Sequence, residues 1–308
     1  MTEPKPVPEA EPEPEPVPEP VPEPKSVPEA EPVPEPPAAD PGHHVRSRLM
    51  RESLLDRQVE RSTEGPVHRM LPEAHVLKIG GRSILDAGRE VVFPVVGALA
   101  ECLRRWKLIL GTGGGVRTRH VFSIGLDLGL PTGVLAQLAQ ADALGNAHIL
   151  GTLLAPHGVV AIPPEIFGHL LPLFLHAAPG VVFSSVPPYS LWEHPPGLGR
   201  IPPHRTDAGA FLLAECFGCK SLTLVKDVDG LYDADPKRHG AARFIREISV
   251  AELRRRGLAT LPFEPVLLDL LANARLLDRF QIVNGLHPER IAAALAGEHV
   301  GTLVHRDG

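Results

Sequence analysis

The sequence predicts an α/β fold in which a mostly parallel central sheet is covered by helices on both faces. Short apolar runs alternate with segments of helical periodicity over most of the chain, and glycine or aspartate clusters follow four of the expected strands. Alternation of this kind is typical of parallel sheets, because each crossover helix covers a face of the sheet. The 308 residues, 43% of them hydrophobic, suffice for one large domain or two small ones.

Residues 1–45 form a segment of different composition. The first 40 residues hold 15 of the 35 prolines, with eleven Asp or Glu against two Lys, a net charge of −9. Proline fixes φ and removes a backbone donor, so we expect an extended, disordered tail. A docking or tethering role for this tail is the alternative. The remaining residues carry about +3 of the overall −6, which gives no strong signal for nucleic-acid binding.

Residues 46–70 are expected to form an amphipathic helix or arm before a domain over 71–308. Leu49, Leu54, Leu55 and Val59 recur among charges at helical spacing, which suits a helix that covers the domain or a neighbouring subunit. No apolar run reaches the roughly 18 residues of a membrane span, and the N-terminus lacks a signal pattern. The chain is therefore expected to be cytoplasmic and to have no membrane partner.

From residue 74 onward, expected strands and helices alternate. Strands are expected over 74–81, 107–115, 180–185, 221–227 and 280–285. Helices are expected over 88–106, 117–129, 137–158 and 206–218. Cys216 lies near the end of the last helix and Cys219 directly after it, at C-x-x-C spacing without a second pair. We therefore expect a helix end with two small buried thiols rather than a structural zinc site.

Four of these strands end in loops that indicate a common ligand site. The loops are Lys78-Ile-Gly80-Gly81, Gly111–Gly115, Asp227-Val-Asp229-Gly230 and Asn284-Gly285. Ligands bind beyond the carboxyl ends of parallel strands, and glycine lets backbone N–H groups approach an anion closely. The sequence thus predicts a polyphosphate site with Lys78 as a mobile positive charge.

Aspartates near these loops have two possible roles. Asp207, Asp227 and Asp229 suit orientation of Lys78 or binding of Mg²⁺, but a lone aspartate is often a helix cap or a turn former. For Asp207, which follows Thr206 at the start of an expected helix, the two readings are equally supported.

The order of the motifs resembles that of the amino acid kinase superfamily, most closely its uridylate-kinase branch. The segments are "VLKIGG", "GTGGGVRTRH", "RTDAGAFLLAECFG" and "LVKDVDGLYDADP". Within that branch, "IPPHRTDAGAFLLAE" and "VNGLHPERIAAALAGEHVGTL" resemble subunits of the molybdenum (Mo/W) storage proteins over about residues 70–305. "ECFGCK" and "PPYSLW" favour the β type, whereas "NAHIL" favours the α type.

This resemblance implies a three-layer αβα sandwich, the amino acid kinase fold. It implies MgATP-dependent uptake of molybdate or tungstate and deposition as polyoxometalate clusters inside a hexameric cage, a trimer of dimers. The partner would be an α-type subunit in a hetero-hexamer, or further copies of this chain in a homo-hexamer. ATP hydrolysis would then serve oxyanion storage rather than phosphoryl transfer to a metabolite.

The resemblance also assigns roles to residues. Lys78 would reach the outer phosphates of ATP, and Asp207 would orient the lysine or the metal. Backbone donors would come from Gly80, Gly81, Gly113 and Gly114. The nucleotide base, ribose and phosphates would lie near Asp227, Asp229, Tyr232 and Asp235.

Arginines and histidines supply the remaining candidates. Arg117, paired with Arg119 in the glycine loop, suits oxyanion binding, with pairing to a surface carboxylate as its alternative. His148, His194 and His204 are candidate cluster ligands, although a lone histidine is more often a core or interface residue. A uridylate (nucleoside monophosphate) or amino acid kinase remains the alternative function, as does an assembly partner that binds ATP without turnover.

Overall fold

The computed structural model describes residues 67–234 and 242–307, and within them the central sheet has eight strands. Their order across the sheet is β3-β4-β2-β1-β5-β9-β10-β8. The strand bounds are β1 Ala74–Ile79, β2 Lys107–Thr112, β3 Val160–Ala161, β4 Gly180–Ser184, β5 Ser221–Lys226, β8 Glu247–Ser249, β9 Arg279–Asn284 and β10 Thr302–His305. Every neighbouring pair is parallel except β9 with β10, which confirms the predicted mostly parallel sheet.

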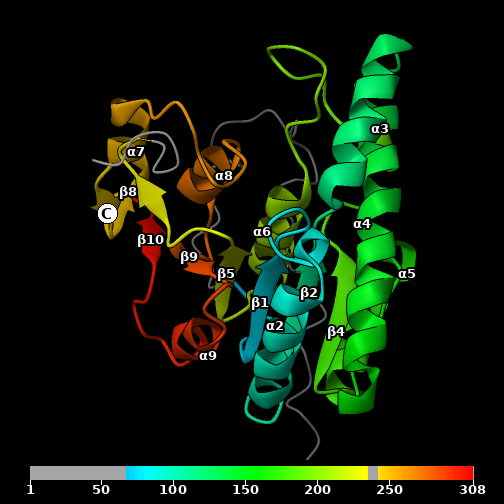
Figure 1. The fold of residues 1–308 in the computed structure, drawn as a ribbon, viewed down its shortest axis with the longest axis vertical. Coiled ribbons are helices and arrows are strands. Elements are labelled where there is room, and N and C mark those ends of the chain that lie inside the picture. Colours follow the sequence, from blue (N-terminus) through cyan, green and yellow to red (C-terminus); the bar gives the residue numbers. More distant parts are fainter. Residues whose placement is uncertain (1–66, 235–241, 308) are drawn as a thin grey trace, which may run out of the picture. The chain divides into compact units, whose positions relative to one another are not determined.

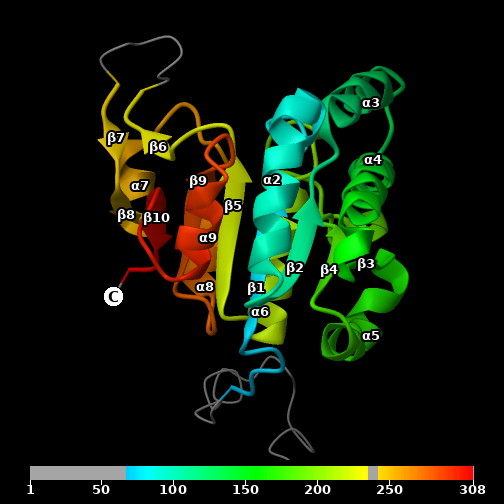
Figure 2. The same cartoon turned by 60° about the horizontal axis from the view of Figure 1, so that its bottom comes forward.

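Helices cover both faces of the sheet, so the fold is the expected three-layer αβα sandwich (Figures 1 and 2). One face packs against α2 (Arg89–Cys102), α4 (Thr132–Leu154) and α9 (Glu289–Leu295). The other packs against α5 (Pro164–Ala177), α6 (Thr206–Phe217), α7 (Val250–Arg256) and α8 (Leu267–Asn273). α3 (Gly115–Asp127) lies on α4, and the strands β6 (Leu231–Tyr232) and β7 (Phe244–Ile245) form a separate antiparallel pair.

The alternation of side chains along β1 explains its continuous apolar run. Val76 belongs to the core on the α6 side of the sheet, whereas Leu77 and Ile79 belong to the core on the α2 side. Successive strand residues point to opposite faces, so a strand covered on both faces needs apolar residues throughout. His75 and Lys78 are the polar exceptions, and both are buried with polar partners. Nδ1 of His75 lies 2.7 Å from Oγ of Ser221, and the Lys78 ammonium, near the end of β1, pairs with Asp207.

The boundaries differ from the sequence prediction in some places. The long helix predicted over 137–158 begins at Thr132, directly after Pro131, and its last turn over Ala155–His157 is a 3₁₀ helix. The predicted tail and arm before residue 67 lie outside the described residues and stay predictions, as do the domain limits. Among the described residues, no helix has both the length and the apolar character needed to cross a membrane.

Candidate functional site

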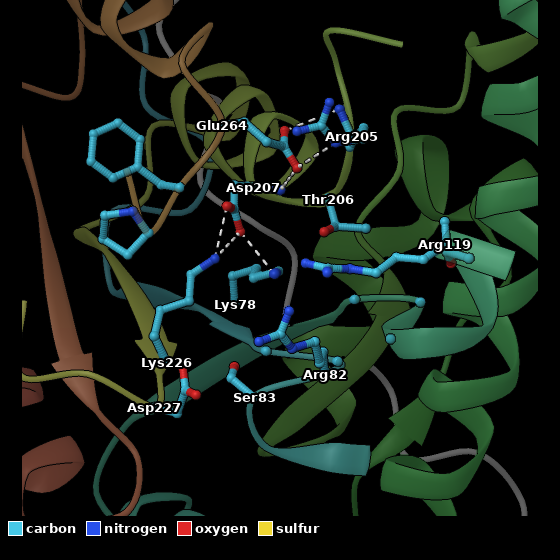
Figure 3. A pocket seen from close by; sticks show the side chains of 18 of the residues that line it. Lys78, Arg82, Ser83, Arg119, Arg205, Thr206, Asp207, Lys226, Asp227 and Glu264 are labelled. Atoms are coloured by element: carbon cyan, nitrogen blue, oxygen red, sulfur yellow. Dashed lines mark hydrogen bonds and ion pairs between the residues drawn. The ribbon is translucent and has the colours of Figure 1, made fainter. Parts of the chain in front are cut away.

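A cavity of about 440 Å³ lies at the carboxyl ends of β1, β2 and β5 (Figure 3). Three of the four predicted loops contribute to its lining, and the Asn284-Gly285 loop does not. The cationic side chains of the lining are Lys78, Arg82, Arg119, Arg205 and Lys226, and the carboxylates are Asp207, Asp227 and Glu264. Positive charge thus exceeds negative charge among the described residues around the cavity.

The two glycine loops meet at the cavity so closely that side chains have no room. A Cβ on Gly81 would lie 2.4 Å from the backbone nitrogen of Gly115 and 2.5 Å from the carbonyl oxygen of Gly113. A Cβ on Gly113 would lie 2.9 Å from the backbone nitrogen of Gly81 and 3.2 Å from Nζ of Lys78. Close backbone approach therefore requires glycine at Gly81 and Gly113. Gly80, Gly81, Gly113 and Gly114 all line the cavity, but the N–H groups of Gly80 and Gly113 donate to the carbonyl oxygens of Val225 and Ile79 and are not available to a phosphate in this structure.

Gly81→Ala is expected to destabilise the protein by about 2–3 kcal/mol, because the overlap involves backbone atoms that no rotamer change can move. Gly97→Ala is the matched control. Gly97 is exposed within α2, and a Cβ there would meet nothing within 4 Å. Alanine should stabilise that helix by about 0.5–1 kcal/mol. Chemical denaturation of both variants checks this, and equal stability of the two would contradict the close approach of the loops.

Asp207 lies between two buried lysines. Its Oδ1 is 2.8 Å from Nζ of Lys78, and Nζ of Lys226 donates to Oδ1 at 2.9 Å and to Oδ2 at 2.8 Å. The side chains of Lys78, Asp207 and Lys226 are 6%, 4% and 11% exposed. The carboxylate therefore holds two ammonium groups together at one wall of the cavity, as the dashed lines in Figure 3 show.

Burial and pairing act in opposite directions on these groups. Burial alone would raise the pKa of Asp207, but the charges and hydrogen bonds of Lys226 and Lys78 outweigh it and hold that pKa well below its ordinary value. For Lys226, burial is the largest effect and lowers the pKa to about 8, although Asp207 favours the ammonium form. The Asp207 carboxylate is thus ionised at neutral pH.

The alternative reading of Asp207 as a helix cap is wrong. Asp207 is the second residue of α6, and its carboxylate faces the lysines. The carboxylate that caps α6 belongs to Glu264, which accepts the backbone N–H groups of Arg205, Asp207 and Ala208. Because Glu264 caps the helix, the Asp207 carboxylate is available to pair with Lys78 and Lys226.

Lys226, Arg82, Arg205 and Glu264 are lining residues that the sequence reasoning did not identify. Lys226 had a readable signal, because it ends the apolar run "SLTLVK" on β5, which pairs in parallel with β1. Glu264 had none, since it lies 57 residues from Asp207 in a loop without periodic pattern.

The side chains of Arg117 and Arg119 lie in different parts of the structure. Arg119 lines the cavity, whereas Arg117 lies against α4, where its Nη2 donates to Oδ1 of Asn146. Asn146 in turn donates to the carbonyl oxygen of Gly113 at 2.5 Å. In this structure Arg117 therefore supports the glycine loop through Asn146, and a direct phosphate contact for Arg117 stays a prediction.

The other predicted nucleotide residues divide between two places. Asp227 lines the cavity. Asp229 lies in a separate cluster, where it accepts from Nδ2 of Asn284 at 3.1 Å, pairs with Arg290, and accepts from the Tyr232 hydroxyl at 3.4 Å. Asp235 lies outside the described residues. The roles of Asp229, Tyr232 and Asp235 toward a nucleotide stay predictions.

The three candidate histidines do not meet in one site. His148 is exposed on α4, and His194 and His204 belong to the loop between β4 and α6. Nδ1 of His204 lies 2.8 Å from Oε1 of the buried Glu193. Among the described residues, no three His, Cys, Asp or Glu side chains form a group suited to a metal ion.

The two cysteines of the C-x-x-C pair differ from the expectation. Cys219, just beyond α6, is buried, but Cys216 is exposed. The last turn of α6 presents Cys216 to its outer side, and burial raises the pKa of the Cys219 thiol to about 12.

The chain belongs to the amino acid kinase family, whose model matches residues 74–284. Within that family it is 48% identical over 260 residues to the molybdenum storage protein subunit beta of Azotobacter vinelandii, covering 83% of this chain and 95% of the relative. A uridylate kinase of Methanothermobacter thermautotrophicus is 29% identical, covering 74% of this chain and 97% of that protein. The predicted β-type resemblance is thereby confirmed.

Solved structures show the same fold. The uridylate kinase from Archaeoglobus fulgidus superposes with a TM-score of 0.59 and 24% identity, covering 75% of this chain and 99% of that one. The UMP kinase from Bacillus anthracis gives a TM-score of 0.57 at 17% identity, covering 77% and 98% of the two chains.

Proposed function

We propose that this chain is a β-type subunit of a molybdenum or tungsten storage assembly. In this proposal it binds MgATP in the Lys78 cavity and uses it to take up molybdate or tungstate, which is deposited as polyoxometalate. The observation that carries the proposal is the Asp207 carboxylate between Lys78 and Lys226 beside two interlocked glycine loops. The cargo is inferred from the 48% identity to a molybdenum storage protein subunit.

The cavity suits a magnesium-bound triphosphate. Five cationic and three acidic side chains, among the described residues that line it, leave an excess of positive charge. Gly81 and Gly113 are so close that only backbone fits between the two loops beside Lys78. The N–H groups of Gly80 and Gly113 donate to the carbonyl oxygens of Val225 and Ile79, so Gly81 and Gly114 are the predicted glycines whose N–H groups would donate to an anion. Mg²⁺, when bound, would neutralise phosphate charge, and Asp227 is the lining carboxylate suited to hold it.

The two lysines provide the electrostatic stabilisation that phosphate cleavage needs. Both ammonium groups are buried and fixed by one carboxylate, so they need little reorganisation as charge develops on the outer phosphate. Asp207 keeps them together despite their mutual repulsion. Arg119, which extends from the right of Figure 3 toward Lys78, and Arg82, which lies just below Lys78, are placed to bind further oxyanion oxygens.

The cargo and the partners follow from the same proposal. An α-type subunit, or further copies of this chain, would complete a hexameric cage. Among the described residues, His148, His194 and His204 do not form one three-ligand group, so in this proposal they would not all bind the same cluster from within one chain. Imidazole can bind Mo(VI) directly or, when protonated, pair with an anionic cluster.

Acceptor dependence distinguishes storage from a metabolite kinase. Phosphate and ADP release by the purified chain, alone and with an α-type partner, would be measured with molybdate or with UMP. Molybdate-stimulated phosphate release without UDP formation supports storage. UMP-dependent formation of UDP and ADP, detected by mass spectrometry, would replace the proposal with a uridylate kinase, the activity named for its more distant relatives.

A further inference from the structure

Residues 261–264 form part of the cavity wall, and Glu264 attaches this wall to α6. Glu264 is 5% exposed. Its Oε2 accepts the backbone N–H of Arg205 at 3.0 Å and of Ala208 at 2.9 Å, and its Oε1 accepts the N–H of Asp207 at 3.0 Å. Nε of Arg205 lies 3.8 Å from Oε1. One carboxylate therefore satisfies three N–H groups at the start of the helix.

This arrangement replaces an ordinary helix cap. The N-cap of α6 is Arg205, whose side chain has no acceptor atom, so the first N–H groups need a partner from elsewhere in the chain. A helix N-terminus also attracts anions. The Glu264 carboxylate occupies that place, which leaves an incoming phosphate to the lysines, the arginines and the glycine loops.

Asp207 connects this cap to the lysine pair. Its backbone N–H donates to Glu264, while its carboxylate accepts from Lys78 and Lys226. The main chain and the side chain of Asp207 are thus held from opposite sides. A shift of Glu264 would move the start of α6 and with it the carboxylate that holds both ammonium groups.

We propose that Glu264 is a positioning residue that fixes Asp207 against Lys78 and Lys226 and holds residues 261–264 as a wall of the cavity. The contribution of this wall to MgATP binding rests on the proposed function; the attachment of α6 does not.

The pKa of Lys226 provides a measurable test of the positioning role of Glu264. The charged groups that act on the Lys226 ammonium are Asp207 from α6, Lys78 from β1 and Glu264 from the wall. Burial lowers the pKa of Lys226 to about 8, and the negative charges of Asp207 and Glu264 oppose that shift. Removal of the Glu264 charge should therefore lower the Lys226 pKa further, so that its ammonium is lost at a lower pH.

The test compares Glu264→Gln with Glu215→Gln in the full chain. Glu215 is a matched control because its carboxylate also accepts three backbone N–H groups, those of Arg275, Leu276 and Leu277, and none of these residues lines the cavity. Amide hydrogen exchange of the ligand-free proteins measures how well each carboxylate protects the backbone N–H groups that it accepts. Affinity for a fluorescent ATP analogue with Mg²⁺, measured from pH 6 to about pH 9.5, follows the loss of the lysine ammonium charge.

For Glu264→Gln we expect exchange over 205–208 to accelerate about tenfold or more. Wild-type affinity should fall as pH rises through about 8, the Lys226 pKa. That midpoint should move lower by on the order of one pH unit in Glu264→Gln. Glu215→Gln should accelerate exchange only over 275–277 and keep the wild-type midpoint. Glu264→Asp, which retains the charge, should accelerate exchange with little change in midpoint, and it carries the exchange test if the glutamine variant does not fold.

Unchanged exchange over 205–208 in the Glu264 variants would overturn the proposal. Faster amide exchange over 205–208 in Glu264→Gln with an unchanged pH midpoint of nucleotide affinity would show that Glu264 only caps α6. That result would also overturn its role in positioning the lysines. If the wild-type protein binds no ATP analogue, the proposed function fails, and the exchange measurements still decide whether Glu264 holds Asp207 and α6.

Discussion

Lys78→Ala is expected to lower the rate of ATP hydrolysis by about two to three orders of magnitude, with a smaller loss of nucleotide affinity. The ammonium group stabilises charge that develops during cleavage more than charge already present on the bound triphosphate. Asp207 keeps Lys226 as a partner in this variant, so no buried carboxylate is left unpaired and the fold should persist. Phosphate release and nucleotide affinity, measured on the same preparation, separate the two effects.

Lys220→Ala serves as the control for Lys78→Ala. Lys220 is exposed and does not line the Lys78 cavity, so its removal should leave hydrolysis unchanged. If Lys78→Ala hydrolysed ATP at the wild-type rate, Lys78 would have no role in the hydrolysis. If Lys78→Ala instead abolished hydrolysis by this chain but left metal loading normal together with an α-type partner, the partner would be the subunit whose hydrolysis drives loading.

Asp207→Asn is expected to destabilise the protein by about 3–5 kcal/mol, because it leaves two buried ammonium groups without a counter-charge. Lys78 and Lys226 would then repel each other at the wall of the cavity. The double variant Asp207→Asn with Lys226→Met removes one of those charges and should recover part of the lost stability. Urea denaturation of the three proteins measures both effects.

A double variant no more stable than Asp207→Asn would show that the cost does not come from unpaired ammonium groups. Asp127→Asn is a useful comparison. Asp127 is exposed at the end of α3 and does not line the cavity, so its substitution should affect stability much less.

The parts of the fold with a strong local pattern could be predicted from sequence. The runs that became β1, β2, β5 and β9 are apolar and end in glycine or aspartate, so both their parallel pairing and their shared ligand edge were expected. Helix α5 was not predicted, and its prolines at both the start and the interior obscure the helical pattern. The antiparallel strand β10, which lies between β9 and the edge strand β8, was also missed, since its four residues carry little periodic signal.

The site was predictable where its chemistry lies within one motif. Lys78 and the glycines belong to single loops, whereas the Glu264 cap joins segments 57 residues apart and has no sequence signal. The two arginines of α3 illustrate a third case. They are two residues apart and so about 200° apart around the helix. Periodicity therefore assigns Arg117 and Arg119 to different faces, but only the packing of α3 on α4 decides which one reaches the cavity.

The most direct test of the central claim is the metal content of the purified protein after incubation with molybdate, with and without MgATP. The proposed function predicts tens of Mo atoms per assembly by mass spectrometry, and only in the sample that received MgATP. The same loading without MgATP would contradict the role of the Lys78 cavity. Metal near zero in both samples, with an α-type partner present, would contradict storage itself.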